Sequence, residues 1–440
     1  MKKIILTVAL MHVCFLLCSQ TKRTVTVEEA GTLHTLIDNS EKYEITDLTL
    51  TGRLDGDDVD FIRQMAGGSW FDGLTDGKLL SLNIENAMIV QGGSYKHGGH
   101  IYSTSYLEIG PSMFALLENL NSIILPASTR EIANGAFYGC TGLVNIEIPD
   151  NTFSIDGYAF YECSSLESVT IGKNLEKIGS YAFSGCVSLK YFIVKEDSHH
   201  YKSINGVLFS KDERTVVIYP NAKSSEYIIP DNVKQIAHLA FRGCSSLEHV
   251  YMPNSVSEIG DYAFGGCKNL KTINISQNAT ALISTFTGCS SLTSITIPNS
   301  IQRVSFDSFY GCESLREIYC KNQNPPHSTS FSGINTIDCI LYVPKNSYDA
   351  YSRAEGWRNF LNIIEKDFTS INNPNANFNI LGSGNKIMIK STIYSEVKIY
   401  SIDGKLIKST TINPGENHIT MNRGRYIVKC SNFAKKVVVR

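Results

Sequence analysis

Cysteine is the residue type whose number and spacing first suggest chemistry in this chain. The sequence has 12 cysteines, and a thiolate can attack a substrate, bind a metal ion or form a disulfide. Most of them form a ladder that recurs every 22 or 23 residues with one interruption, each preceded by a phenylalanine three residues earlier. The ladder consists of Phe137 and Cys140, Phe160 and Cys163, Phe183 and Cys186, Phe241 and Cys244, Phe264 and Cys267, Phe286 and Cys289, and Phe309 and Cys312.

This regularity favours a structural role over a chemical one. A buried free cysteine packs as a small hydrophobic residue, and identical inward-pointing side chains do not turn their Cβ atoms toward one another as a disulfide requires. No histidine recurs with the ladder to complete a metal site. We therefore predict reduced structural thiols, no metal and no cofactor. Cys320 and Cys339 lie outside the ladder, and whether they pair stays open.

Other candidate ligands are weaker. His97 and His100 have glycines between and beside them, which predicts a loop, and no carboxylate or cysteine nearby completes a metal site. The stretch DGDDVD from Asp55 resembles a calcium loop, but Val59 stands where an oxygen ligand is needed, so acids at a helix N-terminus fit better. The chain lacks the P-loop, G-x-S-x-G and H-E-x-x-H motifs. We predict that the protein is not an enzyme.

The apolar residues around the ladder predict the elements that position it. One unit reads L-x-x-V/I-x-I-P-x-x-V-x-x-I-G-x-x-A-F-x-x-C and is clearest from Leu247 to Cys267. Its first part predicts a short strand, and its second part a helical or irregular return. Burying about seven side chains of a unit stabilises it by roughly 14 kcal/mol. The conformational entropy lost when the unit becomes ordered costs more than this, because the cost is about 1 kcal/mol or more per residue. Single units should therefore be unstable, and the period predicts a stacked solenoid.

The pattern of apolar and polar residues also divides the chain into several predicted parts. Two lysines and the apolar run from Ile4 to Leu17 predict a secretory signal peptide. The polar stretch after Glu365 reads as a linker, and the segments beyond it alternate as in a small antiparallel β-sandwich. The predicted parts are a signal peptide (1–19), an N-terminal cap (20–77), the solenoid (78–320) with a hairpin inserted near 195–222, a C-terminal cap (321–365), the linker (366–376) and the sandwich (377–440).

With these residues in place, the repeats resemble the BspA-like leucine-rich-repeat family of bacterial surface proteins. The AF-x-x-C signature, the INGVLF segment and the ending PP…LYVP…Y…W…F carry the resemblance from Glu44 to Glu365. It implies an α/β-type solenoid, a leucine-rich-repeat horseshoe whose outward strand residues line a concave face. The candidate binding residues on that face are Tyr191, His249, Tyr251 and Tyr319.

The tail resembles the type A C-terminal sorting domain of the type IX secretion system. The matching segments are VKIYSIDGKLIK, GRYIVK and KKVVVR, and the motif residues are Asp403, Gly404, Gly424, Tyr426 and Arg440. The resemblance implies recognition by the secretion machinery and a secreted or outer-membrane-surface location in a Gram-negative bacterium. An ordinary terminal sandwich domain is the alternative.

Charge and hydropathy limit the partners. The net charge of −2 provides no field that would attract nucleic acid, and no later apolar segment is long enough to span a membrane. We expect a monomer that binds a host protein, a partner cell or a glycan, as the family resemblance implies. The alternatives are a structural envelope or matrix component without a specific ligand, and an enzyme or enzyme inhibitor. The enzyme alternative requires an Asp or Glu pair beside His249.

Overall fold

The computed structural model describes residues 21–69, 72–368, 378–383, 386–391, 395–413, 415–430 and 433–439. The predicted signal peptide (1–19), residues 369–376 of the predicted linker and Arg440 lie outside the described residues.

Each repeat contributes one strand to a first set of parallel strands. The register advances by one repeat per strand, so that Ile146 pairs with Val169 and Val169 pairs with Phe192. Those central side chains are buried, whereas Asn145 and Glu147 on either side of Ile146 are exposed. We call the surface made by these outward residues the strand face. Its strands are β5 (Ser81–Asn83), β10 (Ser122–Ile124), β12 (Asn145–Glu147), β14 (Ser168–Ile171), β16 (Tyr191–Val194), β20 (Glu226–Ile228), β22 (His249–Tyr251), β24 (Thr272–Asn274), β26 (Ser294–Ile297), β28 (Glu317–Cys320), β29 (Ile340–Pro344) and β30 (Asn362–Lys366).

A second set of very short parallel strands forms the opposite side of each coil. Ile132, for example, pairs with Ile109 and Ile155. The hydrophobic core lies between the two sets of strands. The short strands are β9 (Glu108–Ile109), β11 (Glu131–Ile132), β13 (Ser154–Ile155), β15 (Lys177–Ile178), β21 (Gln235–Ile236), β23 (Glu258–Ile259), β25 (Ala281–Leu282) and β27 (Arg303–Val304).

The segments that return the chain from one strand to the next are turns, and the repeats form a β-solenoid. The prediction of an α/β-type solenoid is therefore wrong in this respect. Between residues 101 and 338, all of which the structure describes, no α-helix is present. A physical reason is visible in the AF-x-x-C segments, where Tyr158 and Glu162 both have a φ of 58°. A right-handed helix cannot pass through residues in this left-handed conformation.

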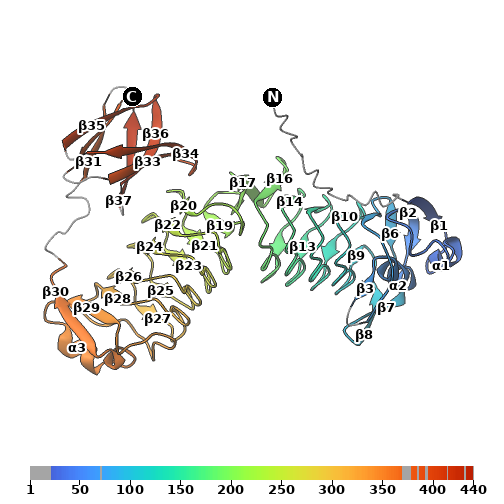
Figure 1. Ribbon diagram of the computed structural model, residues 1–440, viewed down its shortest axis with the longest axis horizontal. Helices are drawn as coiled ribbons and strands as arrows, with labels where there is room; N and C mark the ends of the chain where they lie inside the picture. The colour runs from blue at the N-terminus through green and yellow to red at the C-terminus, as the bar shows by residue number, and fades with distance from the viewer. Residues whose placement is uncertain are drawn as a thin grey trace, which may run out of the picture.

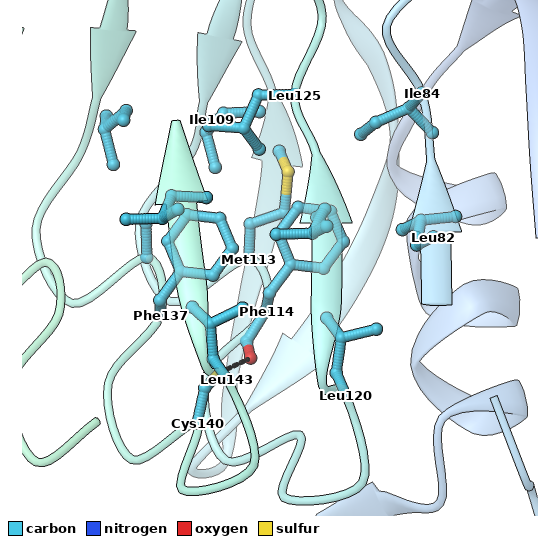
Figure 2. Packing of buried hydrophobic residues seen from close by; sticks show 14 of the residues in the cluster. Leu82, Ile84, Ile109, Met113, Phe114, Leu120, Leu125, Phe137, Cys140 and Leu143 are labelled. Carbon is cyan, nitrogen blue, oxygen red and sulfur yellow. Dashed lines mark hydrogen bonds between the residues drawn. The ribbon is translucent and has the colours of Figure 1, made fainter. Parts of the chain in front are cut away.

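The phenylalanines and cysteines of the ladder fill the core of the coils. The rings of Phe137 and Phe160 stack at a centroid distance of 5.1 Å. The thiol of Cys140 donates a hydrogen bond of 3.0 Å to the carbonyl oxygen of Phe114 in the preceding coil (Figure 2). All ten described cysteines are buried and free, including Cys320 and Cys339.

An N-terminal cap covers the first coil. Helix α2 (Gly56–Met65) begins at Asp55, which forms a reciprocal capping box with Asp58; the acids of DGDDVD thus start a helix, as predicted. His97 and His100 face each other across a β-hairpin, so the predicted loop is a tight turn. The remaining elements are β1 (Lys22–Val27), α1 (Leu33–Leu36), β2 (Asp47–Leu54), β3 (Gly68–Ser69), β4 (Gly73–Leu74), β6 (Ala87–Ile89), β7 (Gly92–His97) and β8 (His100–Thr104).

The pairing between strands of successive coils is interrupted at two places. Between β16 and β20 the chain forms the antiparallel strands β17 (Tyr201–Ile204), β18 (Val207–Ser210) and β19 (Thr215–Ile218). Strand β19 also pairs in parallel with β21, so the inserted hairpin is built into the second set of strands. The other interruption separates β24 from β26, where the spacing between Cys267 and Cys289 is one residue shorter than in the other units.

The C-terminal cap closes the last coil with an aromatic cluster. Trp357 is fully buried and lies edge-on to Phe331 and Tyr351. The cap contains the short helix α3 (Tyr348–Arg353) and the 3-10 turn η1 (Trp357–Asn359). Among the described residues, no helix is long and apolar enough to cross a bilayer.

The tail consists of two antiparallel sheets whose buried side chains form one cluster. Asp403 and Gly404 lie at the turn between β33 and β34, and Gly424 and Tyr426 lie in β36. The strands are β31 (Phe378–Ser383), β32 (Lys386–Ser391), β33 (Ser395–Ser401), β34 (Leu406–Ile412), β35 (Gly415–Thr420), β36 (Gly424–Cys430) and β37 (Phe433–Val439).

Figure 1 shows the solenoid as two arms that meet near β16 and β17. The strand face lies on the upper, outer side of this bend, whereas a leucine-rich-repeat horseshoe has its strands on the inner side. The tail lies against the second arm above β20 and β22 (Figure 1). The strand face therefore carries a second domain on one part of its surface.

Candidate binding face

The residues predicted to bind a ligand all lie on the strand face, but in different places. Tyr191 is 43% exposed on β16, at the last strand of the first arm. His249 and Tyr251 lie on β22, and Tyr319 lies on β28, all in the second arm. The inserted hairpin and β20 therefore separate Tyr191 from the other three.

A groove on the second arm brings Tyr251 and Tyr319 together. It has a volume of about 310 Å³ and crosses β22, β24, β26 and β28. Hydroxyl, amide and ammonium groups line the space between the two tyrosines. The polar residues of the groove are Thr272, Asn274, Gln277, Ser294, Thr296 and Lys321.

Tyr319 belongs to a stacked pair at one end of this groove. Its ring lies 4.6 Å from the ring of Tyr342 at an interplanar angle of 8°, and the Lys366 ammonium lies 4.8 Å from both ring centroids. The Tyr319 hydroxyl donates a 2.8 Å hydrogen bond to Glu317. Burial, together with the nearby Glu317 carboxylate, raises the pKa of Tyr319 to about 12. The hydroxyl therefore stays protonated at neutral pH, and the pair is a rigid aromatic platform.

Glu226 on β20 anchors the tail beside the other end of the groove. Its carboxylate accepts hydrogen bonds from Lys398, at 2.9 Å, and from the Tyr400 hydroxyl, and Lys429 lies 3.6 Å away. Burial alone would raise the pKa of Glu226, but these hydrogen bonds and the two lysine charges lower it to about 2. The Glu226 side chain is therefore a partly buried anion held by three side chains of the tail.

Tyr251 is in contact with the same domain. The Lys429 ammonium lies 4.6 Å from the centre of the Tyr251 ring, a cation–π distance. Tyr251 also packs against a small apolar cluster formed by Ile228 of the solenoid with Tyr400 and Ile427 of the tail. The tail thus covers one side of Tyr251, whereas its other side borders the groove.

The surroundings of His249 bear on the enzyme alternative. Its Nδ1 atom lies 2.8 Å from the Thr272 hydroxyl, and its Nε2 atom lies 3.9 Å from Glu248. Glu248 also forms a 2.7 Å ion pair with Lys271, and this hydrogen bond lowers its pKa. Both Glu226 and Glu248 are thus ionised and paired with lysines. A general acid with a raised pKa, which carboxylate pairs in enzymes supply, is not formed by these two residues.

Glu226, Tyr342 and Lys366 were not predicted as site residues. Glu226 and Ile228 occupy the same register positions as His249 and Tyr251, and Tyr342 occupies that of Tyr319. Aligning the EYII and LYVP segments with the strand of each repeat would have identified all of them except Lys366. The partners of Glu226 lie more than 170 positions away in the sequence, and no local pattern indicates such a contact.

Within the described residues, no group of three or more His, Cys, Asp or Glu side chains is placed to hold a metal ion. His97 instead lies 3.5 Å from Asp72 and 3.4 Å from Arg63. Burial is the main cause that lowers the pKa of His97.

Comparison with protein families identifies the repeats. The model of the BspA type leucine-rich repeat region matches in six copies over residues 101–216 and 217–338. The chain belongs to the BspA-type leucine-rich-repeat family. The matched residues contain the whole phenylalanine–cysteine ladder, the inserted hairpin and most of the strand face.

A solved structure shows the same kind of solenoid as this BspA-type protein. The pneumococcal vaccine antigen PcpA is 18% identical, with a TM-score of 0.53 over 73% of this chain and 80% of that chain. A leucine-rich cell surface protein from Faecalibacterium prausnitzii is 24% identical, with a TM-score of 0.48 over 74% of this chain and 85% of that chain. No curated protein matches the sequence.

Proposed function

We propose that this BspA-type protein is an exported surface protein that binds a protein or glycan through the groove between Tyr251 and Tyr319. The observation that carries the proposal is the groove itself, which has a tyrosine at each end and hydroxyl and amide groups between them. Tyrosine provides large, rigid contact area together with a hydrogen-bonding group and is enriched among residues that dominate binding energy. The groove volume lies at the lower end of the range for ligand pockets, which begins near about 300 Å³.

The stacked pair of Tyr319 and Tyr342 is the strongest part of the proposed site. The contacts with Glu317 and Lys366 hold both rings in place before a ligand arrives. Little side-chain entropy would then be lost on binding, which favours affinity. A sugar ring or a peptide side chain would lie against the exposed edge of this pair.

The experiment is a screen of the full chain against arrays of glycans and extracellular-matrix proteins, followed by affinity measurement on any hit. We expect Tyr319→Ala to weaken binding by at least about tenfold, the loss typical of a central aromatic contact. Tyr310→Ala is the matched control, because Tyr310 is 56% exposed and does not line the groove. If the wild-type protein binds nothing on the arrays, the binding function is refuted; equal losses in both variants would refute the choice of groove.

The proposed surface location rests on the tail and on the apolar N-terminal segment. The tail has the segments that resemble a sorting domain, and it would be read by the secretion machinery of a Gram-negative bacterium. Deleting residues 378–440 in the native host tests this idea. We expect the truncated protein to stay within the cell envelope while the full chain reaches the surface, as followed by fractionation and surface labelling; surface display of the truncated protein would refute it.

A further inference from the structure

We propose that the groove binds an acidic polysaccharide, whose carboxylate or sulfate groups pair with lysine side chains at its two ends while the sugar rings contact its polar floor. This inference rests on the proposed binding function of the groove and adds the chemical class of the ligand. It starts from the charges around the groove. Among the described residues that line the groove, Lys321 is the only charged one, and none is an Asp or a Glu.

Lys321 occupies a position of the repeat for which the first arm provides a reference. Lys195 and Lys321 both lie six residues after the leucine that begins their unit. Their main-chain N–H groups donate to the carbonyl oxygens of Ile171 and Ile297, respectively, each one coil earlier, at 3.2 and 2.9 Å. The two lysines are therefore structurally equivalent, and their surroundings can be compared directly.

In the first arm this lysine is neutralised. The Lys195 ammonium lies 2.9 Å from the Glu147 carboxylate and 3.0 Å from the Asp150 carboxylate. Both acids belong to the unit that lies two coils earlier. An anionic ligand would have to compete with these two carboxylates for Lys195.

In the second arm the same two positions hold amides. Counted from the leucine of each unit, Asn274 corresponds to Glu147. By the same count, Gln277 corresponds to Asp150. Both amides line the groove together with Lys321, and an amide does not neutralise an ammonium group. Among the residues that the structure describes, no carboxylate pairs with Lys321. The second arm therefore has the lysine without its counter-ions, and the charge is available to an anionic ligand.

Ammonium groups without a carboxylate partner also lie beside both ends of the groove. The Lys366 ammonium lies 4.8 Å from the ring centres of Tyr319 and Tyr342. At the other end, Lys435 of the tail lines an adjoining pocket of about 330 Å³ that shares Tyr251 with the groove. Neither lysine pairs with a carboxylate in the described part of the chain. Strands β22 and β28, at the two ends, are three strands apart, which corresponds to about 14 Å at a strand spacing of about 4.8 Å. A polymer with charged groups on successive units can therefore contact both ends.

The polar floor of the groove favours a sugar over an acidic peptide. Thr272, Ser294 and Thr296 provide hydroxyl groups along it. A hydroxyl group both donates and accepts hydrogen bonds, so it matches the hydroxyl groups of a sugar ring in either direction. Lysine is a compact point charge without the planar fork of arginine. It therefore binds carboxylate and sulfate groups alike, and the probes have to distinguish the two.

The test measures the binding of oligosaccharides to the full chain by isothermal titration calorimetry. The probes are oligogalacturonate, which carries carboxylates, its methyl ester, which has the same sugar rings without the charges, and a carrageenan oligosaccharide, which carries sulfates. We expect at least one of the two acidic sugars to bind, with an affinity that falls as sodium chloride is added. The methyl ester should bind at least about tenfold more weakly than an acidic sugar that binds.

Two variants of the groove test the role of Lys321. Lys321→Gln removes the ammonium group, and Gln277→Glu supplies a carboxylate at the position that Asp150 has in the first arm. Both side chains are exposed, so both variants should fold, as circular dichroism can verify. Each should weaken the binding of the acidic sugar at least about tenfold. Lys195→Gln is the matched control, because it removes the equivalent lysine of the first arm, and it should bind within about twofold of wild type.

The proposal is overturned if neither acidic sugar binds, if the methyl ester binds as tightly as the acid, or if both groove variants bind as wild type does. Tighter binding of a glutamate oligopeptide than of both acidic sugars would also overturn it, because an acidic protein would then be the ligand. A neutral glycan that binds to wild type but not to Tyr319→Ala would overturn the choice of an acidic sugar and leave the binding function of the groove intact.

Discussion

The thiol of Cys163 donates a hydrogen bond of 3.1 Å to the carbonyl oxygen of Phe137, 26 residues earlier in the chain. The same bond joins Cys186 to Phe160 and Cys267 to Phe241. The cysteine of each coil thus fills a small space below the phenylalanine and also binds the main chain of the preceding coil. A residue such as alanine would fill part of the space but could not donate the bond.

Because Cys163 both fills space and donates a hydrogen bond, we predict that different substitutions at this position lower the free energy of unfolding by different amounts. Cys163→Ala should lower the free energy of unfolding by about 1–3 kcal/mol, because a cavity forms and the Phe137 carbonyl loses the thiol donor and keeps only the N–H of Cys140. Cys163→Val keeps an apolar side chain and should lose about 1 kcal/mol, the value of one hydrogen bond. Guanidinium-induced unfolding followed by circular dichroism measures both. A Cys163→Val variant as stable as wild type would show that the hydrogen bond contributes nothing.

The ladder thiols should be unreactive in the folded protein. Burial raises the pKa of Cys186 to about 12, so the nucleophilic thiolate is scarce at pH 8. A thiol reagent such as DTNB should therefore react with the described cysteines at pH 8 only after guanidinium is added. Rapid reaction of any ladder cysteine in the native protein would contradict the buried ladder.

The same shift predicts sensitivity to alkali. The pKa of Cys186 is about 12 in the folded protein, against an ordinary value of 9.0, so the folded state retains the proton where the unfolded state loses it. The contribution to stability is complete below about pH 9 and is lost as the pH rises from 9 to 12. Thermal unfolding between pH 7 and 11 should show a falling midpoint above pH 9. Cys186→Ala should flatten this dependence relative to wild type.

Glu226 should control the position of the tail. Glu226→Gln removes the charge that Lys398 and Lys429 surround, leaving two partly buried cations without this anion. We expect the tail to separate from the strand face, with a larger radius of gyration in small-angle X-ray scattering. Glu396→Gln is the matched control, because that side chain is exposed and its contacts lie within the tail. An unchanged scattering profile of Glu226→Gln would contradict the contact.

The pH dependence of this contact follows from the lowered pKa of Glu226. With a value of about 2 in the docked state, against 4.5 normally, the carboxylate contributes its full stabilisation above about pH 4.5. That contribution is lost as the pH falls from 4.5 toward 2. The tail should therefore remain docked at pH 5 and separate near pH 2–3, provided that the solenoid stays folded. Scattering profiles and circular dichroism collected together distinguish undocking from unfolding.

Glu162 offers a stabilising substitution. The residue before each ladder cysteine has a positive φ, and at Gly139 and Gly243 it is glycine, whereas Glu162 has a φ of 58° with a side chain. A left-handed conformation costs a residue other than glycine about 1–2 kcal/mol. Glu162→Gly should raise the free energy of unfolding by up to about 1 kcal/mol, whereas Gly243→Ala should lower it by a similar amount. Loss of stability in both variants would mean that the Glu162 side chain makes a contact worth more than the strain.

The sequence by itself determined the repeated part of the protein. Leu247, Val250 and Phe264 recur as apolar positions of the repeat, and all are buried. Such a signal is readable because each coil contacts mainly its neighbours, so contacts repeat at one separation along the chain. The strand residues that face outward follow from the same period, which is why Tyr251 and Tyr319 could be chosen before their position in a common groove was known.

Only the tertiary structure decided how the coils return, how the second domain sits and where the stack is open. The returns are turns because Tyr158 and Glu162 adopt left-handed conformations, which cannot be predicted from their residue types. The contact of Glu226 with Lys398 spans 172 positions and occurs once, so no periodicity indicates it. The pocket between Phe183 and Tyr219 results from the path of an inserted hairpin. These features depend on where distant segments meet in space, and a local one-dimensional pattern does not contain that information.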